Sequence, residues 1–229
     1  MRSPLKVLIF GPSGMLGHGV TRECLLASDV SQVTLVGRTH MDQQDAKLTQ
    51  VLVPDLTHIA DHAAELKGFD ACFFCLGISS SGMTEEQYTR ITYDLTLAVA
   101  RLLAGINPSM VFVYVSGAGT DSTGESRSMW ARVKGRTEND LLKLPFGGVY
   151  LFRPAFIQPL HGAQSKTASY RRLYQFTRPF MPLIRRLIPK YFLTTEEVAR
   201  AMLNAARIGS GRRVLEVIDI RRLATALSG

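Results

Sequence analysis

The sequence lacks any apolar run long enough to span a bilayer, and its start does not resemble a secretory signal peptide. Only residues Met1 to Pro4 precede the first apolar segment. From these two absences we expect a cytoplasmic protein that makes no membrane contact.

Cysteine is scarce, since Cys24, Cys72 and Cys75 are the three in a chain of 229 residues. An odd number of cysteines without a secretory signal favours free thiols over a disulfide framework. Cys72 and Cys75 have the spacing C-x-x-C, but they lie in the apolar run Asp70–Leu76, which predicts a buried strand. Residues three apart in a strand point to opposite faces. We therefore interpret both as small core residues rather than as a metal or redox pair.

Metal-binding and nucleic-acid-binding patterns are missing as well. His58 and His62 have the spacing of one helix face, but no third ligand or H-E-x-x-H glutamate accompanies them, which indicates a surface helix and no metal. The formal net charge is +8, yet no more than two basic residues are consecutive. This distribution argues against a nucleic-acid partner and suits a protein that binds a multiply charged cofactor. The absence of G-x-x-x-x-G-K-[ST] excludes a P-loop for ATP.

Apolar segments that end in small or polar residues alternate with helical patterns along the chain. The predicted strands are Leu5–Phe10, Gln32–Val36, Leu48–Val53, Asp70–Leu76, Met110–Val115 and Gly148–Phe152. Among the predicted helices are Ile59–Leu66, Ser128–Leu144 and two that begin at capping boxes, Thr84–Gln87 and Thr194–Glu197. This alternation predicts one α/β domain, a doubly wound parallel sheet of the Rossmann type with helices on both faces.

The turn Gly11-Pro12-Ser13-Gly14-Met15-Leu16-Gly17 follows the first predicted strand and opens the first predicted helix. A strand, a glycine-rich turn and a helix together are the layout of a dinucleotide phosphate site. Gly11 permits the tight turn, Gly14 lets the backbone approach a pyrophosphate, and Gly17 lets the helix pack closely. The N–H groups at the helix start then face the phosphates. The spacing G-x-x-G-x-x-G differs from the usual G-x-G-x-x-G.

The carboxyl ends of parallel strands line one crevice, so the residues that follow each predicted strand are candidate contacts of the nucleotide. The second strand ends at Gly37–Arg38 instead of the acidic residue that would bind a free ribose 2′-hydroxyl. A 2′-phosphate can pair with Arg38, so we expect NADP(H) rather than NAD(H); the alternative is a solvent-facing arginine. We expect Asp55 to accept a hydrogen bond from the adenine amino group. The other expected cofactor contacts are Leu56, Leu76, Gly77, Arg153 and Pro154.

Taken together, these motifs resemble the pattern of the short-chain dehydrogenase/reductase superfamily, in its atypical branch. The matching segments run from Gly11 to Pro154, and the resemblance continues more loosely through the predicted helix from Thr194. Within that branch the chain is similar to the Tat-interactive protein group and to sugar-nucleotide epimerase-like reductases. The resemblance implies the fold and a nicotinamide dinucleotide, but it does not identify a substrate.

In that family, a Ser after the fifth strand and a Y-x-x-x-K pair on the next helix carry out hydride-transfer chemistry. The Tyr is the general acid, the Lys holds the nicotinamide ribose and the Ser orients the substrate carbonyl. The resemblance assigns the catalytic positions to Ser116 and Lys134, but Trp130 stands in place of the Tyr. An indole N–H cannot shuttle a proton. The alternative for Lys134 is a solvated helix lysine. The spacing places no other tyrosine of this region beside Ser116 (Tyr88, Tyr93 and Tyr114).

The remaining residues, 155–229, are expected to complete the same single domain with a substrate-side lid and C-terminal elements. Lys166 to Lys190 combines arginines with large apolar residues and is interrupted by prolines. Because prolines break a long helix, we interpret this segment as a lid rather than as a membrane-contacting amphipathic helix. Val214–Ile218 predicts a short strand.

Two functions remain open from the sequence. The first is an NADP(H)-dependent oxidoreductase or epimerase-like enzyme, in which a nonstandard acid or a bound water supplies the proton. The second is a catalytically silent NADP(H)-binding protein with a regulatory or interaction role, which the replacement at Trp130 favours. The sequence names neither the small-molecule substrate nor the oligomeric state.

Overall fold

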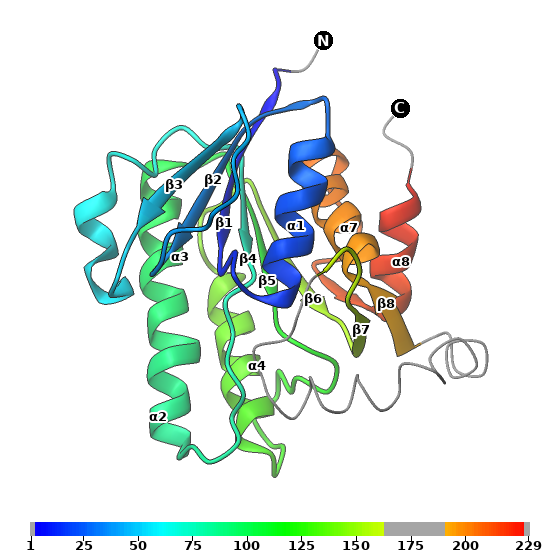
Figure 1. The fold of residues 1–229 in the computed structure, drawn as a ribbon. Coiled ribbons are helices and arrows are strands. Elements are labelled where there is room, and N and C mark those ends of the chain that lie inside the picture. Colours follow the sequence, from blue (N-terminus) through cyan, green and yellow to red (C-terminus); the bar gives the residue numbers. More distant parts are fainter. Residues whose placement is uncertain (1–2, 163–190, 227–229) are drawn as a thin grey trace.

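The computed structural model describes residues 3–162 and 191–226. Its centre is a seven-stranded sheet in which all neighbouring strands are parallel. The strand order β3-β2-β1-β4-β5-β6-β9 is the doubly wound arrangement (Figure 1). The strands are β1 (Leu5–Phe10), β2 (Val30–Gly37), β3 (Leu48–Leu52), β4 (Ala71–Phe74), β5 (Val111–Val115), β6 (Gly148–Arg153) and β9 (Val214–Glu216).

Helices cover both faces of this sheet and give three layers (Figure 1). One face carries α1 (Met15–Leu26), α7 (Thr195–Ile208) and α8 (Val217–Thr225). The other carries α2 (Glu85–Thr89), the π-helical turn η2 (Arg90–Asp94), α3 (Leu95–Ile106) and α4 (Met129–Leu141). Each face has its own apolar core, so the predicted three-layer α/β/α architecture is confirmed.

The central strands are apolar on both faces because helices cover both sides of a parallel sheet. In β4, Phe73 points into the core beneath α1 and α7, whereas Cys72 and Phe74 point into the core beneath α3. Cys75 packs on the same side as Phe73, so Cys72 and Cys75 point to opposite faces, as predicted. All three cysteines are free thiols, and burial raises the pKa of each.

All six predicted strands are present, with ends shifted by at most two residues. The predicted short strand Val214–Ile218 is present as β9, but it ends two residues early because Val217 and Ile218 begin α8. The side chains of Glu216 and Asp219 form a capping box there, with Glu216 N donating to Asp219 Oδ2 at 3.2 Å, which stops β9 after Glu216.

The predicted helix Ile59–Leu66 is wrong. The structure has a 3₁₀-helix, η1 (Leu56–His62), in its place. Asp55 Oδ1 accepts a hydrogen bond from Thr57 N at 2.9 Å and so starts the helical segment earlier than predicted. Within the described ranges, no cluster of three metal-ligating side chains forms around His58 and His62 or elsewhere.

Two short strands are not predicted by the sequence. β7 (Phe156–Gln158) and β8 (Phe192–Thr194) pair in parallel outside the main sheet, and the rings of Phe156 and Phe192 stack at 5.2 Å. β8 leads directly into α7 through the predicted capping box at Thr194. The predicted lid segment Lys166–Lys190 lies outside the described residues. Across residues 3–162 and 191–226, no helix combines the length and hydropathy that crossing a bilayer requires.

Candidate functional site

The glycine-rich turn joins β1 to α1 at the carboxyl end of the sheet. Gly11 has φ +76°, a left-handed conformation that favours glycine, and a Cβ there would lie 2.9 Å from the backbone of Leu76. A Cβ on Gly17 would lie 2.1 Å from the carbonyl oxygen of Gly11, so α1 packs directly onto the turn. At Gly14, that same oxygen, at 3.3 Å, is the only described atom within 4 Å of a built Cβ. Packing against several backbone atoms therefore explains Gly11 and Gly17. A Cβ on Gly14 would make one close contact, with the Gly11 carbonyl oxygen, and would meet no other described atom within 4 Å outside the adjacent residues, so its remaining side is open.

Helix α1 begins at this open space. Gly14 is its N-cap, and in the described structure the helix start has no side-chain cap and no acidic residue in its first turn. The N–H groups of a first helical turn lack intrahelical acceptors and carry the positive end of the helix dipole. The turn therefore presents backbone donors to an anion placed beside Gly14.

Arg38 follows β2 close to the same turn, because the ring of Pro12 packs over Gly37 at 3.6 Å from a built Cβ. The side chain of Arg38 is exposed and has no hydrogen bond or ion pair to any residue that the structure describes. Its guanidinium is therefore available to a ligand at the edge of the glycine turn.

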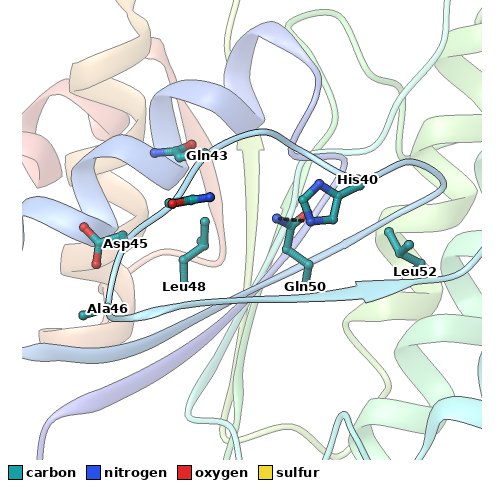
Figure 2. Close-up of a pocket in the computed structure, with 8 residues that line it drawn as sticks. His40, Gln43, Asp45, Ala46, Leu48, Gln50 and Leu52 are labelled. Carbon is teal, nitrogen blue, oxygen red and sulfur yellow. Dashed lines mark hydrogen bonds between the residues drawn. The ribbon is translucent and has the colours of Figure 1, made fainter.

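The loop from Arg38 to Lys47 connects β2 to β3 without a helix and arches over β3 (Figure 2). Gln50 of β3 fastens this loop: its Oε1 accepts from Met41 N at 2.9 Å, and its Nε2 donates to Met41 O at 2.8 Å. A hollow of about 750 Å³ lies beneath the loop, lined by His40, Gln43, Gln44, Asp45, Ala46, Leu48, Gln50 and Leu52. None of the predicted cofactor contacts lines this hollow. Gln50 therefore matters here because it fixes the loop that begins with Arg38.

Asp55 and Leu56 follow β3. The bond from Thr57 N to Asp55 Oδ1 holds the pKa of this exposed carboxyl below its usual range. Asp55 is therefore ionised at neutral pH, with Oδ2 left to accept from a ligand. The Leu56 side chain is buried in the core beneath α3, so this residue can offer a ligand only its backbone.

Lys134 lies on α4 and reaches the end of β5, where its Nζ donates to the backbone oxygen of Ser116 at 2.5 Å. The Lys134 side chain is half-buried, and desolvation lowers its pKa to about 8 although the nearby Glu138 carboxylate acts in the opposite direction. The structure thus brings together the two predicted catalytic residues, Ser116 and Lys134. In the structure Lys134 is hydrogen-bonded to the backbone and half-buried rather than fully solvated.

The hydroxyl of Ser116 points away from the open crevice. Its Oγ donates to Oε1 of Glu138, a carboxylate with no exposed surface. Arg153, at the end of β6, binds both oxygens of the same carboxylate and also donates to Ser122 Oγ at 2.7 Å. One buried ion pair therefore ties α4 to the ends of β5 and β6, and it engages the only proton that the Ser116 hydroxyl has.

Trp130 begins the same helix, one turn before Lys134. A Cβ built on Gly119, in the loop after β5, would lie 3.4 Å from the end of the indole ring. The indole is half-buried and packs over this loop. Trp130 therefore forms part of the wall beside the carboxyl end of β5.

Two tyrosines that sequence spacing does not place here lie close to Lys134. A small cavity of about 10 Å³ is lined by Leu76, Gly77, Ile78, Tyr88, Ile91, Thr92, Thr96, Tyr114 and Lys134. Tyr88 comes from α2 and Tyr114 from β5, so three separate elements meet at Lys134. Glu138, four residues after Lys134, is the other residue that spacing misses, because its burial becomes visible only in the structure.

The chain is similar in sequence to several known proteins. The chain is 29% identical over 153 residues to the protein HTATIP2 of Rattus norvegicus, a match that spans 66% of this chain and 62% of that protein. It is 28% identical over 154 residues to the protein FMP52-2, mitochondrial, of Scheffersomyces stipitis, across 65% of each. The chain therefore spans less than two thirds of the length of these relatives. No protein-family profile matches it.

Solved structures agree on the fold. A short-chain dehydrogenase from Burkholderia cenocepacia in complex with NADP superposes with a TM-score of 0.66 at 14% identity, covering 97% of this chain and 93% of that one. The enzyme WbmF of Bordetella bronchiseptica in complex with NAD⁺ superposes with a TM-score of 0.67 at 17% identity, covering 97% and 77%. The chain is therefore similar in sequence to HTATIP2 and FMP52-2 and shares the Rossmann-type fold of the short-chain dehydrogenases.

Proposed function

We propose that the chain binds NADP(H) at the carboxyl end of its sheet and acts as an oxidoreductase or epimerase-like enzyme on a small-molecule substrate. The observation that carries the proposal is the open, uncapped start of α1 beside Gly14. Backbone donors, a helix dipole and a missing Cβ fit a diphosphate there. The superposed structures named above contain NADP in one case and NAD⁺ in the other, which supports a nicotinamide dinucleotide of either kind.

The residues that would hold this cofactor, Arg38 aside, come from four strand ends and from α4. The turn Gly11–Gly17, with Ser13, Met15 and Leu16, receives the diphosphate, and Asp55 and Leu56 receive the adenine. Leu76 and Gly77 line the middle of the cofactor, and Lys134 holds the nicotinamide ribose. Arg153 and Pro154 close the nicotinamide end. When bound, the cofactor supplies or accepts a hydride.

The preference for NADP(H) rests on Arg38. Its guanidinium is exposed and without a partner in the described chain, and two charge-assisted hydrogen bonds to a 2′-phosphate suit it. We expect Arg38→Ala to weaken NADPH by roughly 10- to 100-fold and NADH by less than about threefold. Fluorescence titration measures both affinities, with Arg101→Ala on α3 as the matched control. Equal losses for the two nucleotides would refute the 2′-phosphate assignment.

A second function is favoured by one specific observation, namely that the family's two proton-handling side chains are unavailable. Trp130 replaces the tyrosine, and the Ser116 hydroxyl donates to Glu138. The second candidate is therefore an NADP(H)-binding protein without turnover, in which occupancy of the site controls a protein contact. Turnover of NADPH with a panel of carbonyl compounds separates the candidates, with Trp130→Tyr beside the wild type. Turnover by the substituted protein alone favours the silent protein, and robust turnover by the wild type excludes it.

Domain organisation and compartment are proposals as well. We propose that residues 155–229 belong to the same domain, with β9 extending the edge of the sheet and α7 and α8 covering one of its faces. The cytoplasm stays our expected compartment, although the named fungal relative is called mitochondrial. Fluorescence microscopy of the tagged full chain tests it, and mitochondrial signal would contradict it.

A further inference from the structure

Hydride transfer to a carbonyl needs a proton donor, and the site offers few. The indole N–H of Trp130 does not exchange its proton at physiological pH. Ser116 has a single O–H, which the buried Glu138 carboxylate accepts. Lys134 is a further group with an exchangeable proton. It reaches the end of β5, where its Nζ is 2.5 Å from Ser116 O.

A cavity that could hold a proton-carrying water borders Lys134. The cavity of about 10 Å³ beside Lys134 is lined by four hydroxyl-bearing side chains: Tyr88, Thr92, Thr96 and Tyr114. This volume is close to what one water molecule requires, and polar partners surround it. The side chains of Tyr88 and Thr92, four residues apart, both border this cavity.

The π-helical turn η2 explains why these hydroxyls share one face. Tyr88, Thr92 and Thr96 are spaced by four residues, which in an α-helix rotates each successive side chain by about 40°. The wider turn from Arg90 to Asp94 rotates less per residue and offsets part of this drift. Tyr88, Thr92 and Thr96 therefore all border the cavity that Lys134 also lines.

The charged and titratable groups around Lys134 come from three elements. Glu138 on α4 is the acidic one, and it is engaged by Arg153 of β6 and by Ser116. Tyr88 of α2 and Tyr114 of β5 face the cavity, and burial raises the pKa of both phenols. Desolvation lowers the pKa of Lys134 to about 8, so its ammonium gives up a proton more easily than an exposed lysine does.

We propose that Lys134 is the proton donor that replaces the missing tyrosine, and that the hydroxyl pair of Tyr88 and Thr92 resupplies it. This inference rests on the proposed dinucleotide function. The carbonyl carbon receives a hydride with both its electrons from the reduced nicotinamide, which becomes oxidised. The carbonyl oxygen takes a proton from the Lys134 ammonium, and the product is an alcohol. The neutral amine then regains a proton from water through Thr92 and Tyr88.

The decisive variant is Lys134→Arg. A guanidinium still offers a cation to the ribose, but it does not release a proton near neutral pH. With NADPH and 4-nitrobenzaldehyde as the probe, we expect this variant to bind NADPH within about threefold of the wild type and to lose about 100-fold in rate. The wild-type rate should fall as pH rises through about 8. Retained turnover in Lys134→Arg would overturn the proposal, because a lysine that only holds the ribose tolerates arginine.

The relay is tested by Tyr88→Phe, with Tyr93→Phe as the matched control. Tyr93 lies in the same helical segment, but its hydroxyl donates to Asp140 at 2.5 Å, away from the cavity. NMR of the free protein with ¹³Cε-labelled lysine follows the Lys134 titration without any cofactor. We expect the Lys134 pKa to shift in Tyr88→Phe and to stay unchanged in Tyr93→Phe, and the rate to fall roughly tenfold in Tyr88→Phe alone. Identical titration curves and rates in the two variants would overturn the relay.

Different results contradict the proton-donor role of Lys134 and the proposed dinucleotide site. NADPH that binds the wild type but is not oxidised by the aldehyde contradicts proton donation by Lys134 and leaves the dinucleotide site intact. Absence of NADPH binding contradicts the proposed function itself, and this inference with it.

Discussion

Gly14 and Gly17 lie three residues apart in one turn, yet the structure predicts opposite consequences for an added methyl group. At Gly17 the new Cβ would lie 2.1 Å from the Gly11 carbonyl oxygen and 2.8 Å from Pro12 Cα. Both are backbone atoms, so the helix or the turn has to move, at a cost of about 3 kcal/mol. At Gly14 the only described neighbour is 3.3 Å away, and φ −80° with ψ 161° suits any residue. Replacing this N-cap glycine by alanine should cost less than about 1 kcal/mol.

We expect NADPH binding to respond in the opposite way, because Gly14→Ala should weaken binding although it barely changes stability. A methyl group on Gly14 occupies the space in which we place the diphosphate and removes at least one charge-assisted hydrogen bond, worth about 1.5–3 kcal/mol. We expect Gly14→Ala to raise the Kd for NADPH by roughly 10- to 100-fold. Its Tm should stay within about 3 °C of the wild type, while Gly17→Ala should lose on the order of 10 °C.

Differential scanning fluorimetry and NADPH titration on the same preparations measure both quantities. A folded Gly14→Ala variant that binds NADPH as tightly as the wild type would refute the reasoning, because the diphosphate would then lie elsewhere. A Gly17→Ala variant with unchanged Tm would show that the turn is looser than the geometry requires.

Further predictions concern the polar groups behind the site. Glu138→Gln removes the buried carboxylate partner of the Arg153 guanidinium, which is 13% exposed, and leaves it only Glu216 at 3.4 Å; this should lower the free energy of unfolding by about 3 kcal/mol in urea titration. Glu85→Gln, which breaks the exposed pair with Arg132, should change the free energy of unfolding by less than about 1 kcal/mol. Similar losses in Glu138→Gln and Glu85→Gln would contradict the buried-pair assignment. Gly135→Ala places a Cβ 1.7 Å from Asp121 O and should destabilise the fold at least as much as Gly17→Ala, which thermal unfolding can check. Because the pKa of Lys134 is lowered from 10.5 to about 8, the folded state binds this proton less tightly than the unfolded chain, so stability should rise as pH increases between those values. Over this pH range the free energy of unfolding of the wild type should rise by at most about 3 kcal/mol more than that of Lys134→Met, and by less than this bound because the side chain is half-buried. Parallel pH profiles for the two proteins would contradict the lowered pKa.

Much of the fold is predictable because it depends on local signals. Continuous apolar runs mark the strands that helices cover on both faces, and Thr84 and Thr194 mark helix starts through their capping boxes, both of which form. The local signal misleads at Val217 and Ile218, where β-branched residues suggest a strand. The capping box of Glu216 and Asp219 overrides that preference. The short pair β7–β8 joins segments far apart in the chain, and periodicity does not report such pairing.

The site is predictable in its backbone but not in its side-chain network. The glycine turn and Arg38 follow from spacing alone, whereas the inward orientation of the Ser116 hydroxyl depends on a carboxylate that α4 delivers from Glu138. In the same way, the sequence does not show that Tyr88 and Lys134 line one cavity, since they come from separate elements and the π-helical turn after Tyr88 changes the helix phase. Neither effect leaves a pattern in the sequence.

The account depends above all on whether the start of α1 receives a diphosphate. Isothermal titration of the purified full chain with NADPH and with NADH tests this directly. We predict saturable binding at one site per chain, tighter for NADPH, and lost in Gly14→Ala. Absence of measurable heat and of fluorescence change with both nucleotides, in a folded preparation, would contradict the account.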